Sequence, residues 1–215
     1  MPPHTEYPLT FAPSLKPTTF PSMFVTGMGR FNRTLSPELQ NATPNPSLRP
    51  LLVVFETDKL LWPFWVDIKL VKPFVKNKKG EVFDQIGRPL NLYPDVMVIL
   101  KSLSKKNYTM AVASRSYDAE NTKTLLELFD IAKFFAHVVV RPCDKIHQMT
   151  ELREVTHVEF EDMLNFDGEA KNIELTENSG IPSILCRFGL DLASLDVGLK
   201  KFAVKKRRDL DELVL

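Results

Sequence analysis

Five apolar residues followed at once by two carboxylates constrain this chain more than any other stretch of its sequence. The run LLVVF at residues 51–55 is rich in branched and large side chains, and Pro50 precedes it. A run that is apolar at every position predicts a strand buried on both faces, which is typical of parallel sheets. Glu56 and Asp58 then lie on one side of an extended chain at the strand's carboxyl end, where such sheets bind ligands. We therefore expect a metal or phosphate site here; two solvated loop acids are the alternative.

Composition excludes several classes of protein. The 215 residues, 44% hydrophobic and 26% charged, suffice for one α/β domain with tails. The 28 basic and 27 acidic residues nearly cancel, so bulk charge predicts neither a nucleic-acid nor a membrane partner. No apolar run reaches the roughly 20 residues that span a bilayer, and the first residues do not predict a signal peptide. Cys143 and Cys186 predict free thiols in a reducing compartment, the cytoplasm or alternatively the nucleus.

Strand and helix patterns alternate after the first strand. Further strands are predicted at Tyr108–Ala113, His137–Val140, Met163–Phe166 and Ile184–Arg187. Helices are predicted at Pro94–Ser104, around Thr124–Phe129, after Lys145, at Ala170–Asn178 and at Leu192–Phe202. Repeated strand and helix units indicate an α/β fold with a doubly wound parallel sheet. A hairpin at Val82–Ile86 and Pro89–Leu92 adds a small β-hairpin flap at the edge of the sheet.

The two ends of the chain differ from the domain predicted over residues 50–203. Residues 1–49 carry nine prolines without a period, which blocks helices and sheet ladders and predicts a disordered arm. A short apolar piece of the arm that docks on the domain or on a protein partner is the alternative. An organellar targeting segment is less favoured, because no arginine precedes Arg30. Residues 204–215 form a basic and acidic tail, which is more typical of a solvated helix end than of a nuclear signal.

Polar residues follow four of the predicted strands. Besides Glu56 and Asp58, they are Ser114 with Arg115, then Lys145, then Asp167. The carboxyl ends of parallel strands meet at one edge of a sheet, so we expect these side chains to face one pocket.

This order of motifs resembles the haloacid dehalogenase superfamily. The segments WPFWVD, LYPDV, ASRS and NFDGEAKNI are similar to those of its eukaryotic magnesium-dependent phosphatase branch, and the likeness runs from about Leu51 to Phe202. The resemblance implies a haloacid dehalogenase-like, Rossmannoid domain with Mg2+ as its cofactor. It also implies a phosphomonoester substrate, either a small molecule such as a sugar phosphate or a phosphotyrosine.

The first motif of that family assigns roles to the residues after the first strand. It consists of two aspartates separated by one residue, with a threonine two places beyond the second. The first aspartate attacks phosphorus, and the second shuttles a proton. Here Glu56 stands at the nucleophile position, Asp58 at the acid/base position and Leu60 at the threonine position.

The remaining motifs imply the substrate and metal contacts. Ser114 matches a hydroxyl that binds a phosphoryl oxygen, Arg115 matches a neighbouring substrate contact, and Lys145 matches the cation that neutralises the nucleophile and the phosphoryl group. The family's paired aspartates of the fourth motif appear as Asp167 and Gly168. The resemblance thus implies metal ligation by Glu56, the carbonyl oxygen of Asp58, and Asp167, with water completing the shell.

Two functions remain open. The extra methylene of Glu56 moves its carboxylate along the line of attack, and a misplacement of about 1 Å can cost about 100-fold in rate. The chain is therefore expected to be a weak phosphatase or, alternatively, an inactive pseudo-phosphatase that binds phosphate or a protein. In the aromatic cluster after the first motif, Trp62 is a candidate substrate contact, although core packing is the alternative for such a ring.

Overall fold

The computed structural model describes residues 48–68 and 70–212, so the predicted arm lies almost entirely outside the described residues. Within them, five parallel strands form one sheet in the order β6-β5-β1-β7-β8. The strands are β1 (Leu52–Phe55), β5 (Met110–Ser114), β6 (His137–Val140), β7 (Met163–Asp167) and β8 (Ser183–Leu185). This topology confirms the doubly wound parallel sheet.

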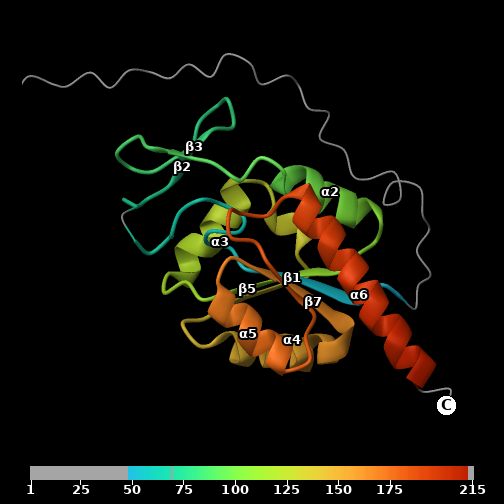
Figure 1. The fold of residues 1–215 in the computed structure, drawn as a ribbon. Coiled ribbons are helices and arrows are strands. Elements are labelled where there is room, and N and C mark those ends of the chain that lie inside the picture. Colours follow the sequence, from blue (N-terminus) through green and yellow to red (C-terminus); the bar gives the residue numbers. More distant parts are fainter. Residues whose placement is uncertain (1–47, 69, 213–215) are drawn as a thin grey trace, which may run out of the picture. The chain divides into compact units, whose positions relative to one another are not determined.

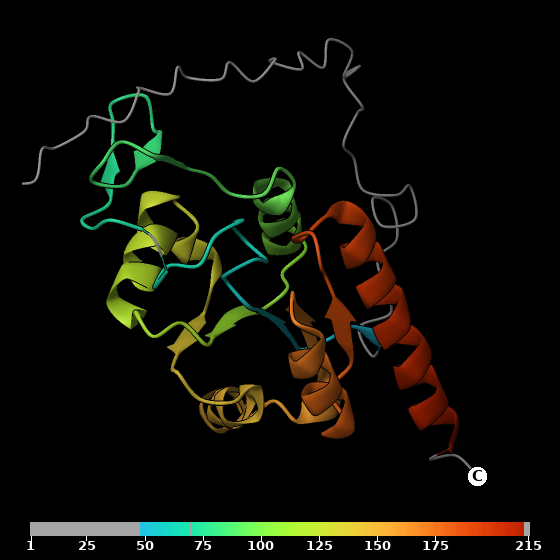
Figure 2. The ribbon, with the colours of Figure 1, turned by 60° about the vertical axis from the view of Figure 1, so that its left-hand side comes forward.

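Helices cover both faces of the sheet (Figure 1). One face carries α2 (Val96–Lys105), α3 (Ala119–Leu128) and α6 (Leu192–Glu212), and the other carries α4 (Lys145–Thr156) and α5 (Ala170–Asn178). Two short 3-10 turns, η2 (Ala132–Phe134) and η3 (Phe160–Asp162), precede β6 and β7. Figure 2 shows the same layers from a second direction.

The central strand explains why the sheet forms where it does. All four residues of β1 are fully buried; Val53 and Phe55 pack among the helices of one face, and Leu52 and Val54 among those of the other. Each such side chain contributes roughly 1.5–3 kcal/mol by leaving water. Phe55 pairs with Val112 of β5 and Phe166 of β7, so Glu56 follows level with the carboxyl ends of both neighbouring strands.

A separate antiparallel sheet is built from β2 (Val75–Lys76), β3 (Val82–Phe83) and β4 (Pro89–Leu90). We call residues 70–92 the flap. The predicted hairpin is confirmed as β3 and β4, although both strands are shorter than expected. The strand β2 was not predicted, because its two residues are exposed and show no strand pattern in the sequence. Two ion pairs, Lys72 with Asp118 and Lys76 with Asp130, join the flap to the two ends of α3.

The last helix is longer than expected. It continues beyond Phe202 to Glu212, so residues 204–212 are helical rather than a separate tail. The segment AVKKRRDLDE contains neither glycine nor proline and is rich in good helix formers, which explains the extension. Among the described residues, no helix has both the length and the apolar character needed to cross a membrane.

Candidate active site

Lys145 joins two carboxylates at the carboxyl edge of the sheet. It is the first residue of α4, its side chain is fully buried, and its Nζ lies 2.7 Å from Glu56 Oε2 and 3.0 Å from Asp167 Oδ2. The ammonium also donates to the carbonyl oxygen of Ala113 at 2.7 Å. Burial alone would lower the pKa of Lys145, but the two carboxylates outweigh it and raise that pKa above its ordinary value. Of the six side chains expected to face one pocket, Glu56, Lys145 and Asp167 are thus in direct contact, and we call these three the ionic floor.

Glu56 is held by donors on both of its oxygens. Oε1 accepts the Thr57 backbone N–H at 2.8 Å, and Oε2 accepts the Arg115 backbone N–H at 3.3 Å as well as the Lys145 ammonium. The residue is only 7% exposed. Its carboxylate is therefore held in place by the backbone N–H groups of Thr57 and Arg115 and by the Lys145 ammonium.

Asp58 is held in a different way. Its Oδ1 accepts the indole N–H of Trp62 at 2.7 Å, and its Oδ2 accepts the backbone N–H of Val66 at 3.0 Å. Burial raises its pKa to about 7, and the charges of Glu56 and Asp67 act in the same direction, against the two hydrogen bonds that lower it. A carboxyl that titrates near neutral pH can both give and take a proton, which suits a general acid and base.

Asp167 ends β7 and is anchored by the start of the next helix. Its Oδ1 accepts the backbone N–H of Glu169 at 2.8 Å, and its Oδ2 accepts the side-chain N–H of Asn172 at 3.0 Å. A Cβ added at Gly168 would lie 3.4 Å from the carbonyl oxygen of Lys59, so a side chain needs little adjustment there. Among the described residues, no group of three or more His, Cys, Asp or Glu side chains is arranged to hold a metal ion.

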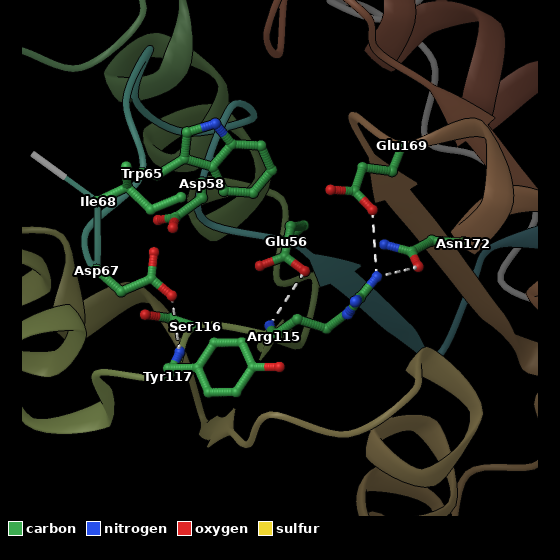
Figure 3. A pocket seen from close by; sticks show the side chains of 10 residues that line it. All are labelled: Glu56, Asp58, Trp65, Asp67, Ile68, Arg115, Ser116, Tyr117, Glu169 and Asn172. Atoms are coloured by element: carbon green, nitrogen blue, oxygen red, sulfur yellow. Dashed lines mark hydrogen bonds and ion pairs between the residues drawn. The ribbon is translucent and has the colours of Figure 1, made fainter.

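Ser114 and Arg115 lie at the end of β5 but point in different directions. The Ser114 hydroxyl is fully buried and lies 2.6 Å from the hydroxyl of Thr57. The Arg115 guanidinium reaches Glu169 at 3.2 Å and Asn172 at 3.4 Å, at the rim of the site (Figure 3).

Thr57 is a site residue that the strand pattern alone would miss. In an extended chain its side chain would point away from those of Glu56 and Asp58. The strand, however, ends at Phe55, and Thr57 begins a turn in which its carbonyl oxygen accepts the N–H groups of Leu60 and Leu61. The turn brings the Thr57 hydroxyl to Ser114 and to 3.4 Å from both carboxylates.

The open part of the site is a pocket of about 140 Å³. It is small beside the roughly 300–1,000 Å³ of pockets that enclose drug-sized ligands, so it suits a phosphoryl group with its leaving group outside. Figure 3 shows the residues that line it: Glu56, Asp58, Trp65, Asp67, Ile68, Arg115, Ser116, Tyr117, Glu169 and Asn172.

Several expected site residues do not line this pocket. Ser114, Lys145 and Asp167 are fully buried and are not among its lining residues. Trp62 is also fully buried, and its ring stacks on Phe64 at 5.7 Å while its N–H holds Asp58. The aromatic rings at the pocket are those of Trp65 and Tyr117 instead.

Leu60 occupies a place in the hydrophobic core. It has no exposed surface, and its backbone carbonyl accepts the N–H of Leu190. The hydroxyl that the resemblance implies at this position is therefore replaced by an apolar contact.

Comparison with known proteins gives concordant results. A sequence model of the family described as Acid Phosphatase matches residues 48–205. The human protein named magnesium-dependent phosphatase 1 is 39% identical over 154 residues, which cover 72% of this chain and 88% of the relative. A haloacid dehalogenase-like hydrolase superfamily protein of Schizosaccharomyces pombe is 31% identical over 137 residues, covering 59% and 80% of the two chains.

The fold of this chain also resembles the folds of solved structures. The crystal structure of a haloacid dehalogenase superfamily hydrolase from Ehrlichia chaffeensis matches with a TM-score of 0.53 and 11% identity, covering 72% of this chain and 98% of that one. At this identity the likeness concerns the arrangement of strands and helices alone.

Proposed function

Because the chain belongs to the acid phosphatase family, within the haloacid dehalogenase-like magnesium-dependent phosphatases, we propose that it hydrolyses phosphomonoesters at the pocket above Glu56 and Asp58, at a low rate. The observation that carries the proposal is the contact of one buried ammonium with two buried carboxylates. Lys145 lies 2.7 Å from Glu56, which lines the pocket, and 3.0 Å from Asp167. An attacking carboxylate and a phosphoryl group are both anions, so their approach needs such a cation.

The proposed reaction has two steps. Glu56 attacks phosphorus, a Glu56–phosphorus bond forms, and the bond from phosphorus to the leaving oxygen breaks while Asp58 gives that oxygen its proton. Asp58 then takes a proton from water, whose oxygen attacks phosphorus and releases phosphate and the free Glu56 carboxylate. The pKa of Asp58, about 7, supports its use in both directions.

Magnesium is the cofactor indicated by the name of the human relative. The residues that would hold it are Glu56, Asp167 and the carbonyl oxygen of Asp58. They fit the chemistry of Mg2+, which commonly takes one or two protein carboxylates and keeps several waters. The two carboxylates converge, since both contact the same Lys145 ammonium. When bound, the ion would supply Lewis-acid stabilisation of charge on the phosphoryl oxygens.

The low rate follows from the three changed positions. Glu56 is one methylene longer than aspartate, Gly168 brings no carboxylate, and Leu60 brings no hydroxyl. These changes also favour a second candidate function, a pseudo-phosphatase that binds phosphate or a protein without turnover. Small phosphates, among them sugar phosphates, and phosphotyrosine are the substrate classes proposed for the active form.

Phosphate release from a panel of sugar and aryl phosphates distinguishes the two functions. We expect release by the full chain with Mg2+, little release with a chelator, and loss of release in Asp58→Asn. If the chain and Asp58→Asn release phosphate equally slowly under every condition, turnover is absent and the pseudo-phosphatase function replaces the proposal.

We also propose that the protein works in a reducing compartment of the cell. Cys143 and Cys186 are both free, which fits a reducing compartment such as the cytoplasm. A protein partner for the arm at residues 1–49 is also part of the proposal.

A further inference from the structure

A second pocket adjoins the pocket of Figure 3, which we call the main pocket. The second pocket, which we call the side pocket, has a volume of about 210 Å³. Its outer walls come from residues 142–144, before α4, and from Lys171 and Leu175 of α5. Three residues line both pockets: Arg115, Tyr117 and Asn172. Since the main pocket has room for little more than a phosphoryl group, the side pocket offers space for part of the leaving group.

The walls of the side pocket combine apolar surface with charge. The exposed ring of Tyr117 and the side chains of Pro142 and Leu175 supply the apolar part. Lys171 adds a positive charge at the edge of this surface. A short carbon chain that ends in an acid group matches such a lining, because pockets bind through apolar surface and a few placed polar groups.

The main pocket has the opposite electrostatic character. Four carboxyl groups line it, against the single guanidinium of Arg115. Mg2+ at its proposed ligands would balance charge beside the phosphoryl group, but Asp67 and Glu169 lie outside that set of ligands. A second anionic group on a substrate is therefore repelled by the main pocket even when the metal is bound, and is attracted by Lys171 in the side pocket.

The Lys171 ammonium is available to a ligand. Within the described part of the chain, no group pairs with it. The acid of the side pocket, Asp144, is by contrast engaged: its Oδ1 accepts the backbone N–H of His147 at 3.1 Å and lies 2.8 Å from the ring Nδ1 of the same residue. The Arg115 guanidinium is also engaged, at the wall between the pockets. An incoming acid group can thus pair with Lys171 without breaking an existing ion pair.

We propose that the side pocket binds an acid group, either a carboxylate or a second phosphate, on the leaving group of the phosphomonoester, and that Lys171 recognises this group. The proposal rests on the proposed function for the phosphoryl group in the main pocket. It narrows the small phosphates to those that carry a second acid group.

A matched pair of substrates tests the preference. 6-Phosphogluconate carries a carboxylate where sorbitol 6-phosphate carries a hydroxymethyl group, and the two are otherwise identical. For the full chain with Mg2+, kcat/KM should be about fivefold higher for 6-phosphogluconate, the effect of one partly exposed charge pair. Sorbitol 1,6-bisphosphate, with a second phosphate at the same carbon, shows which acid group is preferred. If neither acid-bearing compound exceeds sorbitol 6-phosphate, the proposal is wrong.

The variant Lys171→Gln tests the residue. It should lower the ratio of kcat/KM for 6-phosphogluconate over sorbitol 6-phosphate by about fivefold, through a higher KM for the acid. Lys101→Gln is the matched control, because it removes an exposed lysine from α2, on the other face of the sheet, and should leave the ratio unchanged. If both variants lower the ratio equally, net charge and not the side pocket sets the preference, and the proposal is wrong.

Cys143 reports occupation of the side pocket directly. Its thiol is half-buried in that pocket, whereas Cys186 is only 3% exposed. In full-length Asp58→Asn, which we expect not to turn over, 6-phosphogluconate at about ten times its calorimetric Kd should slow alkylation of Cys143 by iodoacetamide about tenfold. Mass spectrometry measures the rate. If 6-phosphogluconate binds and Cys143 is still alkylated at the unprotected rate, the acid group binds elsewhere and the proposal is wrong.

Failure of this inference is distinguishable from failure of the proposed function. Protection of Cys143 with no phosphate release by the parent would retain the side pocket and remove the phosphatase. Phosphate release by the parent without any preference for the acid-bearing compounds would retain the phosphatase and remove the side pocket.

Discussion

The ionic floor and the rim of the pocket both hold ion pairs, but they differ in contact with water. Lys145 and Asp167 have no exposed side-chain surface and Glu56 has 9%, whereas Arg115 and Glu169 at the rim are 43% and 40% exposed. Charges in a dry environment interact strongly and are costly when a partner is removed, while exposed pairs are screened and contribute little. Stability and chemistry are therefore coupled in the floor, whereas the ion pair between Arg115 and Glu169 at the rim should contribute little to stability.

Removing the floor's cation should have the largest effect. Lys145→Met leaves two buried carboxylates facing each other, and we expect the free energy of unfolding at pH 7 to fall by about 3–5 kcal/mol, with loss of phosphate release. The destabilisation should shrink as the pH is lowered, because protonated carboxyls need no cation. Denaturant unfolding at several pH values measures it.

The matched rim variant is Glu169→Gln. It removes one carboxylate from an exposed pair with Arg115, so the free energy of unfolding should change by less than about 1 kcal/mol. If Lys145→Met and Glu169→Gln lower the free energy of unfolding by the same amount, burial does not make the ion pairs of the floor more important for stability than the ion pair of the rim.

The second prediction concerns the length of the nucleophile. Glu56→Asp should raise Mg2+-dependent phosphate release by at least about tenfold, because shortening the side chain restores an attack distance whose loss costs about 100-fold. Gly168→Asp should raise it further by returning a carboxylate near the metal, since a Cβ at Gly168 would lie no closer than 3.4 Å to its neighbours. Steady-state kinetics of the single and double variants measure both effects.

An unchanged rate in Glu56→Asp, with phosphate and Mg2+ still bound, would assign the loss of activity to Leu60 or Gly168. A parent that is already fast would show that Glu56 is a competent nucleophile.

The ionic floor was predictable because it depends on strand ends. Glu56 follows and Asp167 ends a buried strand, and the parallel register brings these two positions together; Lys145 begins the helix after β6 and reaches both from there. The same reasoning located every strand of the sheet to within a few residues, since continuous apolar runs are a strong signal.

The parts that were missed depend on turns and on tertiary contacts. Thr57 enters the site because the chain turns immediately after Phe55, and the alternation of a strand does not report where the strand ends. Strand β2 is two exposed residues long, and its pairing with β3 leaves no pattern in the sequence. The burial of Trp62 is set by its partners Asp58 and Phe64, which no local pattern reveals.

The third prediction tests the missed residue. Thr57→Val keeps the shape of the side chain but removes the hydroxyl that lies 2.6 Å from that of Ser114, and both residues are fully buried. We expect the free energy of unfolding to fall by about 1–3 kcal/mol, because the Ser114 hydroxyl then keeps only its longer contact with the Ser116 backbone N–H, at 3.4 Å. Thr57→Ser, which keeps the hydroxyl, should cost less than the valine variant in the same denaturant experiment. A larger loss in the serine variant would mean that the methyl group, not the hydroxyl, holds the turn.

The smallest expected effect concerns Asp58, which lies between the floor and the rim. Burial raises its pKa to about 7, so its proton is present below pH 7 and is lost as the pH rises through that value. For an alkyl phosphate, whose leaving oxygen needs this proton, kcat/KM should therefore fall above about pH 7. An aryl phosphate with a good leaving group should show a flatter profile, because its leaving oxygen needs less help.

The variant Asp67→Asn tests whether the charge of Asp67, at the rim, changes the pKa of Asp58. Asp67 raises the pKa of Asp58, so its neutralisation should move the falling limb of the alkyl phosphate profile to lower pH. The shift should be roughly half a pH unit, the effect of a partly screened charge interaction of about 0.7 kcal/mol. Profiles of parent and variant at the same Mg2+ concentration measure it, and the shift should shrink in high salt. A shift that salt does not reduce would instead be due to the hydrogen bond between Asp67 and the Tyr117 backbone N–H, and the rim would act on Asp58 through loop position and not through charge.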